Sequence, residues 1–523
     1  MSNSNIQPKD THRSILKSTS ILSLGTLSSR ILGFIRDIIL ARLLGTGLRA
    51  DAFFVALKIP NLFRSFVGEG ATNAAVVPVF SEYQANSEKS EFWRFVSVML
   101  VLALMALSII TLIGILTAPL IVRLIAPGFM ADPEKLTLTI RLTKLIFPYL
   151  VLIGLAAYSM AVLHSFRSFT APAFSPCLFN LALIVGALFS SQWMQEPVFG
   201  LAGAVIVGGF LQLIVQVIAL KRNGMRWYRP VTLRHPGAAQ VGRLLVPRMI
   251  GAGVYQLTVF IDTFCASLAA IVGAGGISAI YYANRIIQFP MGLFSIALAS
   301  AVLPTLSGLV AGENMDRFKG TLAFSLKNIF YVIFPASVLM ILLAEPVIRA
   351  LFERGAFDAY STGITSSALL FYSLGLFSFS AIKILVSAFY ALQDTKTPVK
   401  VAAVCLGINT VLNFILMFPM GIGGIALASS VAATADFIIL FILLEKKIGQ
   451  LEVGLRAYTF KLLLASVVMA GVVLLGWQWT AAFHEILRMV IVMVIGGLAY
   501  GWITVLLGVE QSRQIWRMIS KRN

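Results

Sequence analysis

Charged residues are scarce in this sequence: they make up 12% of its 523 residues, whereas 58% are hydrophobic. A soluble domain needs a polar surface that so few charges do not supply, and long apolar stretches of this kind are solvated by lipid. The composition therefore excludes a soluble domain and predicts an all-α polytopic membrane protein.

Cysteine and histidine are also rare. The three cysteines, Cys177, Cys265 and Cys405, lie within apolar stretches, and their spacing matches neither a disulfide framework nor a zinc site. The four histidines are scattered, and none stands in a Ser-His or His-Glu arrangement. We therefore expect no metal, no cofactor and no covalent catalysis, so that the protein is not an enzyme.

Acidic residues number 22 against 41 basic ones. In a soluble protein this excess would suggest a nucleic-acid partner, but here the basic residues gather in the links between apolar stretches. Because short loops rich in Lys and Arg stay in the cytoplasm, the pattern places both termini inside and predicts no nucleic-acid partner. The first stretch shows no cleavable signal peptide, so the first helix is expected to anchor the chain.

The apolar stretches predict about 14 membrane-spanning helices, arranged as two six-helix lobes followed by two further helices. The predicted segments are a cytoplasmic N-terminal segment (1–18), an N-terminal lobe (19–221), a basic cytoplasmic linker (222–239), a C-terminal lobe (240–446), and a last part (447–523) with two extra helices and a basic cytoplasmic tail.

The two lobes repeat one another. AAVVPVFSEY around Pro78 resembles SAVLPTLSGL around Pro304, and HSFRSFTAPAF around Pro172 corresponds to YALQDTKTPVK around Pro398, with one shared spacing of 226 residues. Because each repeat holds an even number of spans, the lobes are expected to be pseudo-symmetric about an axis along the membrane normal.

The first two predicted spans carry charges inside apolar surroundings. A charge in a spanning helix costs about 2.5–3.5 kcal/mol on insertion scales, so it persists where it faces a wet cavity or a partner. Internal ion pairs are one explanation, but cations outnumber acids here, which favours a cationic cavity for an anionic ligand. These charged residues are Arg30, Arg36, Asp37, Asp51, Lys58, Arg64 and Glu69.

The helical rise sets their depth. With 1.5 Å per residue, Arg36 and Lys58 both lie roughly 10–12 Å below the outer end, and Arg30 lies roughly 20 Å down, as does Arg64. The repeat spacing matches Arg36 with Asp262. Opposite charges at one depth in two related helices indicate a central cavity, and they leave two roles open for Asp262: ion coupling, or a static pair with Arg36.

The eighth predicted span adds Ser278 and Arg285, in SAIYYANRIIQFP. Arg285 is expected about 12–13 Å deep. Pro290 and Pro60 each remove a backbone hydrogen bond and are expected to kink their helices.

Six motifs are spread over the chain: SRILGFIRD, ADAFFVALKIPNLFR, GEGA, VVPVFSEY, YYANR and QDTKTPVK. They resemble the motifs of the MurJ/MviN family, the lipid II flippases of bacteria. The resemblance implies the fold of the MOP flippase superfamily, in the bacterial cytoplasmic membrane. It implies as substrate the undecaprenyl-diphosphate-linked disaccharide-pentapeptide of peptidoglycan synthesis, moved from the inner to the outer leaflet.

The same resemblance assigns functional residues. The family's required charged residues fall on Arg30, Arg36, Asp51, Lys58, Arg64, Glu69 and Arg285, with Ser278 nearby. One departure is Asn284, where many members have Asp, which puts the role of an acid there in doubt. The implied partners are lipid II, membrane lipids and other proteins of cell-wall synthesis, and nothing in the sequence requires more than a monomer.

Residues and resemblance together predict an alternating-access carrier. A diphosphate favours Arg, whose guanidinium binds phosphate oxygens with two parallel hydrogen bonds, and the two helices outside the repeat are free to form a groove for the lipid tail. A MOP-superfamily exporter of drugs or of another lipid-linked oligosaccharide is the alternative. A membrane glycosyltransferase is a third reading, but the sequence shows no outward cluster of catalytic carboxylates.

Overall fold

The computed structural model describes the backbone of residues 8–67, 71–230, 232–451 and 454–513, with the side chains in these ranges except 8–19, 63–75, 246–252, 255 and 456. Within that part the chain is helical and contains no strand. It divides into two compact units, Met1–Gln256 and Leu257–Asn523, each described by itself.

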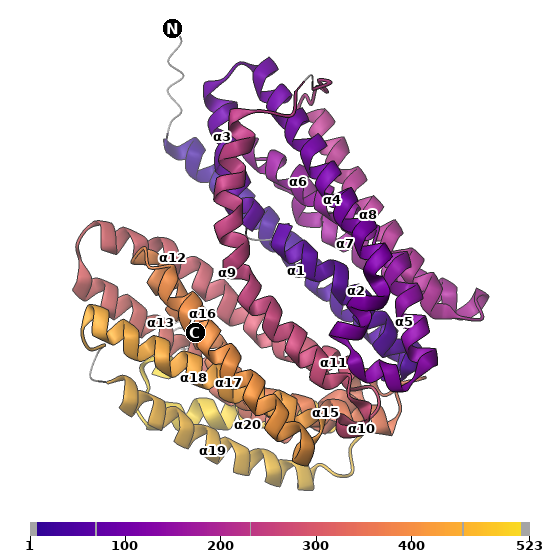
Figure 1. Cartoon of the computed structure of the whole chain (residues 1–523). Coiled ribbons are helices and arrows are strands. Elements are labelled where there is room, and N and C mark those ends of the chain that lie inside the picture. Colours follow the sequence, from indigo (N-terminus) through magenta and orange to yellow (C-terminus); the bar gives the residue numbers. More distant parts are fainter. Residues whose placement is uncertain (1–7, 68–70, 231, 452–453, 514–523) are drawn as a thin grey trace. The chain divides into compact units, whose positions relative to one another are not determined.

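The first unit holds eight α-helices, a short 3₁₀-helix and the beginning of a ninth α-helix in the described residues (Figure 1). They are α1 (Pro8–Leu44), α2 (Leu48–Val67), α3 (Ala71–Asn86), α4 (Lys89–Ile125), η1 (Pro127–Ala131), α5 (Pro133–Ile146), α6 (Tyr149–Ser165), α7 (Thr170–Trp193), α8 (Pro197–Arg222) and the first part of α9 (Pro236–Ala266).

The second unit continues from the end of α9. It contains α10 (Ala269–Val272), α11 (Gly276–Pro290), η2 (Met291–Ser295), α12 (Ile296–Ala311), α13 (Met315–Leu342), α14 (Ala344–Phe352), α15 (Ala359–Leu374), α16 (Leu376–Ala391), α17 (Lys396–Met420), α18 (Ile422–Ile448), α19 (Leu455–Trp479) and α20 (Glu485–Leu506).

Among the described residues, ten stretches are long and apolar enough to cross a membrane, or eleven if the bent pair α15 and α16 is one span. The predicted number of about 14 also includes helices such as α1, whose charged residues lower their hydropathy. An all-α polytopic membrane protein is therefore confirmed, while the helix count stays a prediction.

Helix starts follow the spacing found in the sequence. Lys89 and Met315 begin α4 and α13, and Thr170 and Lys396 begin α7 and α17. Both pairs are 226 residues apart, as are the aspartates that cap α5 and α15. Asp132 accepts a hydrogen bond from the backbone N–H three residues later, as Asp358 does. The shared spacing supports a duplication.

The turn after α6 repeats as well. Arg167 and Gln393, again 226 residues apart, both adopt a left-handed backbone, with φ of 56° and 58°. Such values are uncommon for residues other than glycine. The same unusual backbone conformation therefore occurs at two matched positions, although the residues there differ.

The kink predicted at Pro290 stays a prediction, but the type of helix changes at this residue. Pro290 is the last residue of α11, and the five residues that follow form a π-helical segment before α12 begins. Proline breaks the backbone ladder, and single π turns insert where that ladder is interrupted. Pro60 lies inside α2. Gly273 and Gly275 have positive φ in the turn before α11, as expected for a tight turn.

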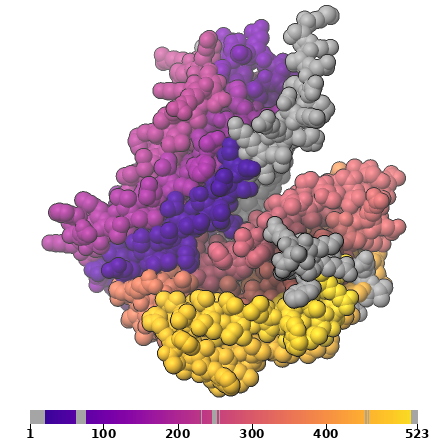
Figure 2. All heavy atoms as spheres, turned by 180° about the vertical axis from the view of Figure 1, so that it is seen from behind, coloured from indigo at the N-terminus to yellow at the C-terminus, as the bar shows by residue number. Residues whose placement is uncertain are grey.

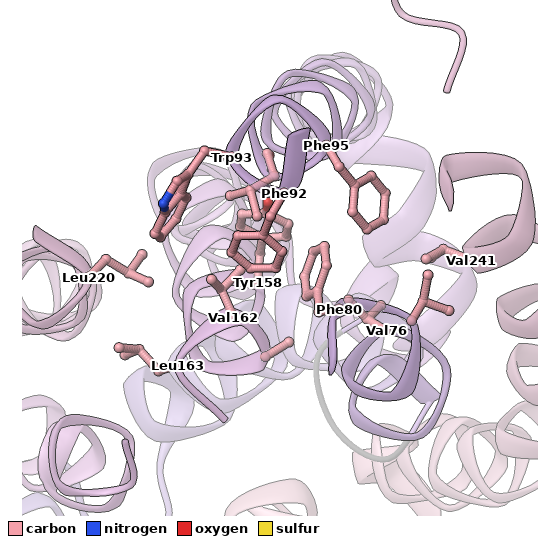
Figure 3. Packing of buried hydrophobic residues seen from close by; sticks show 13 residues of the cluster. Val76, Phe80, Phe92, Trp93, Phe95, Tyr158, Val162, Leu163, Leu220 and Val241 are labelled. Atoms are coloured by element: carbon pink, nitrogen blue, oxygen red, sulfur yellow. Dashed lines mark hydrogen bonds between the residues drawn. The ribbon is translucent and has the colours of Figure 1, made fainter. Parts of the chain in front are cut away.

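An aromatic cluster fixes one end of the first unit (Figure 3). Phe80 on α3 lies edge-on to Phe95 on α4, with centroids 5.1 Å apart, and to Tyr158 on α6, at 5.8 Å. The buried hydroxyl of Tyr158 donates to the carbonyl of Val96 at 2.6 Å. These contacts hold α3, α4 and α6 together.

The last two helices of the chain pack on the second unit through α13. Tyr500 on α20 donates from its hydroxyl to the Tyr331 carbonyl at 2.9 Å, and Tyr458 on α19 donates to the Lys327 carbonyl at 3.1 Å. The opposite sides carry exposed apolar residues, such as Val467 and Leu498, and form part of the surface seen in Figure 2. The helix pair is thus anchored on one side and apolar on the other.

Candidate substrate-binding site

Arg36 lies at the centre of a buried polar cluster in the first unit. Its Nη2 donates to Asp37 Oδ1 at 2.7 Å, its Nε donates to the same oxygen at 3.0 Å, and its Nη1 donates to Asn180 Oδ1 at 2.9 Å. Arg36 is 6% exposed and Asp37 is fully buried. A charge this deep requires such partners.

Close packing of α1 on α7 brings Asn180 to Arg36. A Cβ at Gly25 would lie 2.6 Å from the Ala173 carbonyl oxygen, so only glycine permits this approach. Asn180 also donates from Nδ2 to the Ser29 carbonyl at 3.0 Å. The side-chain amide is therefore held by α1 on one side while it orients the guanidinium on the other.

The other predicted cations of α1 and α2 differ in exposure. Arg30 is exposed and Lys58 is half-buried. The side chain of Arg64, and Glu69 altogether, lie outside the described residues. The structure thus brings Arg36 together with Asp37, whereas Arg30, seven residues from Asp37 on the same helix, points to the surface of the unit.

Asp51 has a partner that the sequence did not indicate. Its Oδ2 accepts a hydrogen bond from Lys135 Nζ at 2.7 Å, and both side chains are almost fully buried. Lys135 lies in the first turn of α5, with its ammonium 4.3 Å from the centroid of the Phe129 ring. A cation at a helix N-terminus is unfavourable, and the carboxylate of Asp51 offsets this.

Ser278 and Arg285 share helix α11 in the second unit. Arg285 Nη2 donates to the Tyr281 hydroxyl at 3.2 Å, and its guanidinium carbon lies 5.4 Å from the centroid of the Tyr281 ring. The fully buried Ser278 donates to the Gly275 carbonyl at 3.0 Å. That hydrogen bond ties Ser278 to the turn that precedes α11.

Asp262 lies in a second polar cluster, formed by α9, α17 and α18. Asn413 Nδ2 donates to Asp262 Oδ1 at 2.9 Å, and Ser429 Oγ donates to Asp262 Oδ2 at 3.4 Å. Asn409 Nδ2 in turn donates to Ser429 Oγ at 3.3 Å. Asp262 is half-buried, and Asn413 and Ser429, which donate to it, are both neutral side chains.

The clusters around Arg36 and Asp262 follow one plan. Arg36, on the first helix of the first repeat, is held by Asn180 on α7, and Asp262, on the first helix of the second repeat, is held by Asn413 on α17. The helices α7 and α17 begin at matched positions of the two repeats. The sign of the charge differs between them. In the part of the chain that is described, no group of three or more His, Cys, Asp or Glu side chains could hold a metal ion.

Comparison with known proteins identifies the family. The family model "Lipid II flippase MurJ" matches residues 40–495. The chain belongs to the MurJ family. A relative from Burkholderia cenocepacia, "Lipid II flippase MurJ", is 35% identical over 463 residues, covering 87% of this chain and 89% of that protein. A relative from Buchnera aphidicola, "Probable lipid II flippase MurJ", is 33% identical, and the match covers 95% of this chain and 98% of that protein.

Solved structures agree with this assignment. A MurJ structure in an inward closed conformation has a TM-score of 0.79 and 27% identity, covering 93% of this chain and 98% of that chain. A multidrug-resistance MATE transporter of the MOP superfamily, with a TM-score of 0.67 and 16% identity, shares the fold. Because the family model and the relatives are named lipid II flippases, the assignment favours a flippase over a drug exporter and over an enzyme.

Sequence reasoning missed Lys135, Asn180 and Asn413. The only signal for Asn180 and Asn413 in the sequence was a polar amide side chain in an otherwise apolar stretch. A buried polar group without a partner costs free energy, so such amides point to a partner on a neighbouring helix.

Proposed function

We propose that the protein flips lipid II from the inner to the outer leaflet of the bacterial cytoplasmic membrane by alternating access. The carrying observation is the match to the MurJ family over residues 40–495. The protein is a multi-pass protein of the inner membrane, and its substrate is a lipid-linked anion. Both termini are proposed to be cytoplasmic.

The cations are proposed to bind the diphosphate. Arg30, Arg36 and Arg285 would hold it, while Lys58 and Arg64 draw it in. In the structure Arg36 is bound by Asp37 and Asn180. Substrate binding would therefore require Arg36 to exchange the carboxylate for a phosphate oxygen, and a guanidinium can do so with two parallel hydrogen bonds.

The acids are proposed to orient these cations or exchange partners with them during the cycle. Asp37 is positioned for this because it already binds Arg36. Asp51 would act through Lys135, by holding α2 against α5. Glu69 keeps this proposed role, although it lies outside the described residues.

Asp262 is proposed to bind a cation or proton during the return of the empty carrier. Its carboxylate accepts hydrogen bonds from Asn413 and Ser429, which hold it at a fixed place between α9, α17 and α18. The alternative is a static pair with Arg36. The exposed apolar side of α19 and α20 is proposed to form the groove for the lipid tail.

A reconstituted flipping assay tests the proposal. Vesicles containing the protein and labelled lipid II should move the label across the bilayer, and Arg36→Ala should abolish movement because both Asp37 and the phosphate lose their cation. Arg42→Ala is the matched control, since Arg42 is an exposed cation on the same helix. Equal flipping by the wild type and by Arg36→Ala, at matched protein levels, would contradict the proposal.

A further inference from the structure

A cavity of about 510 Å³ opens in the second unit where α13 and α14 meet α19 and α20. Its apolar side is formed by residues such as Leu342, Leu343 and Val473. Its polar side carries two carboxylates and two guanidiniums, those of Glu345, Glu485, Arg349 and Arg488. Pockets that bind small molecules fall in this size range and combine an apolar lining with a few polar groups.

The carboxylates gather around Arg349. Its Nη1 donates to Glu485 Oε1 at 3.2 Å, its Nε lies 3.4 Å from Glu353 Oε2, and its Nη2 is bonded to Glu345. Although partial burial opposes the charge, Glu485, Glu345 and Glu353 hold the pKa of Arg349 above its usual value. Of these acids, Glu345 and Glu485 line the cavity beside Arg349, so two acids next to one cation leave this side of the cavity negative.

Arg488 makes the other side positive. Its guanidinium carbon lies 3.9 Å from the centroid of the Trp477 ring, and its Nε and Nη2 both donate to the Trp477 carbonyl. No acidic side chain among the described residues forms an ion pair with Arg488. A guanidinium stacked in this way is fixed in place with its charge intact.

The cavity lies at the level of lipid headgroups. The apolar helix α19 ends at Trp479, α20 begins at Glu485, and both are long and apolar enough to span a membrane. Trp479 is 88% exposed, and Phe483 in the same turn is 51% exposed. Exposed tryptophan at the end of a spanning helix is typical of the membrane interface.

We propose that this cavity binds the headgroup of a zwitterionic phospholipid, with the phosphate on Arg488 and the ammonium on the carboxylates of Glu345 and Glu485. The balanced charges of the lining match a neutral headgroup that carries both signs. Glu485 and Arg488 are three residues apart on α20, about 4.5 Å along its axis. That separation suits the two-carbon link between ammonium and phosphate in phosphoethanolamine. The binding is independent of lipid II.

Native mass spectrometry of the full-length protein tests this proposal. The protein is released from vesicles containing equal amounts of phosphatidylethanolamine and phosphatidylglycerol, and the retained lipid is identified. The wild type should retain phosphatidylethanolamine over phosphatidylglycerol by about tenfold, the factor expected of a charge-assisted hydrogen bond. Equal retention of the two lipids would overturn the proposal.

Two sets of variants localise the binding. Glu345→Gln with Glu485→Gln should reduce the preference to near one, and Arg488→Ala should lower retention of both lipids. Glu196→Gln is the control, because Glu196 pairs with Arg49 in the first unit and does not line the cavity. A preference that survives the double substitution would overturn the proposal.

A third variant tests the cavity without removing the carboxylates, in case the double Glu345→Gln, Glu485→Gln variant unfolds. Leu474→Trp fills part of the cavity and leaves the ion pairs in place. It should lose the retained lipid while its melting temperature without added lipid stays at the wild-type value. Full retention in this variant would place the lipid elsewhere on the protein.

Discussion

Lys135 and Asp51 show how strongly one side chain depends on another in this protein. Both are nearly inaccessible, and their ion pair joins α2 to α5. The Arg49–Glu196 pair has the same charges but is about half exposed on each side. Exposed pairs contribute about 0–1 kcal/mol, whereas removing one partner of a buried pair costs about 3–5 kcal/mol.

Lys135→Met should therefore destabilise the first unit by about 3–5 kcal/mol, because Asp51 is left buried without its cation. Arg49→Met should change stability by less than about 1 kcal/mol. Denaturation in detergent, followed by intrinsic fluorescence, measures both. Combining Lys135→Met with Asp51→Leu should recover most of the loss, and a double variant as unstable as the single one would argue against the pair.

Loops between helices carry their own stabilising contacts. Asp394 accepts hydrogen bonds from the backbone N–H of Thr397 at 3.0 Å and from Lys447 Nζ at 2.9 Å, so it both caps α17 and ties it to α18. The Lys447 hydrogen bond and the Thr397 contacts lower the pKa of Asp394 to about 2. The carboxylate is thus more acidic in the folded protein than in the unfolded chain.

This shift predicts a pH dependence. A carboxyl whose folded pKa is depressed adds stability above its unfolded pKa, about 3.9, and that stability is lost as pH falls toward 2. Asp394→Asn should cost up to about 1 kcal/mol at pH 7, because asparagine can still cap the helix but the partly exposed pair with Lys447 loses its negative charge. The difference in melting temperature between wild type and variant should shrink below pH 4. A difference that stays constant down to pH 2.5 would show that charge is not involved.

The spanning helices could be predicted from the sequence because each one appears there as a long apolar stretch. Breaks inside spans were harder to predict. The 47° bend between α15 and α16 occurs at Gly375, where a Cβ would lie 2.7 Å from the Ser430 Cα. Ser430 also donates to the Phe371 carbonyl at 2.7 Å, which satisfies a group freed by the bend. Such a contact depends on α18, which lies far along the sequence.

At the scale of the whole molecule, the charged residues in the spans could be predicted, but most of their partners could not. A charge in an apolar stretch is visible in the sequence, whereas Lys135 and Asn180 reach Asp51 and Arg36 from helices about a hundred residues away. The helical rise predicts how deep each charged residue lies along its helix, but it does not predict toward which neighbouring helix the side chain points. The pairing was set by close approach at positions such as Gly25.

The transport cycle gives a further prediction. Moving an anion outward is favoured by an inside-negative potential, by about 2.3 kcal/mol per charge per 100 mV, and the empty carrier must then return. Asp262→Asn should weaken the dependence of flipping on potential or sodium and should spare lipid II binding. Flipping in vesicles with imposed ion gradients measures this, with Asp358→Asn as a control at a helix cap. Unchanged ion and voltage dependence would remove Asp262 from the mechanism.

The matched left-handed turns at Arg167 and Gln393 have an evolutionary consequence. At these two positions the backbone angle agrees, while the side chains are a cation and a neutral amide. Under the duplication that the spacing supports, the turn was inherited and the residues at it were free to diverge. A rare dihedral angle can therefore mark a shared origin at a position where the residues themselves no longer agree.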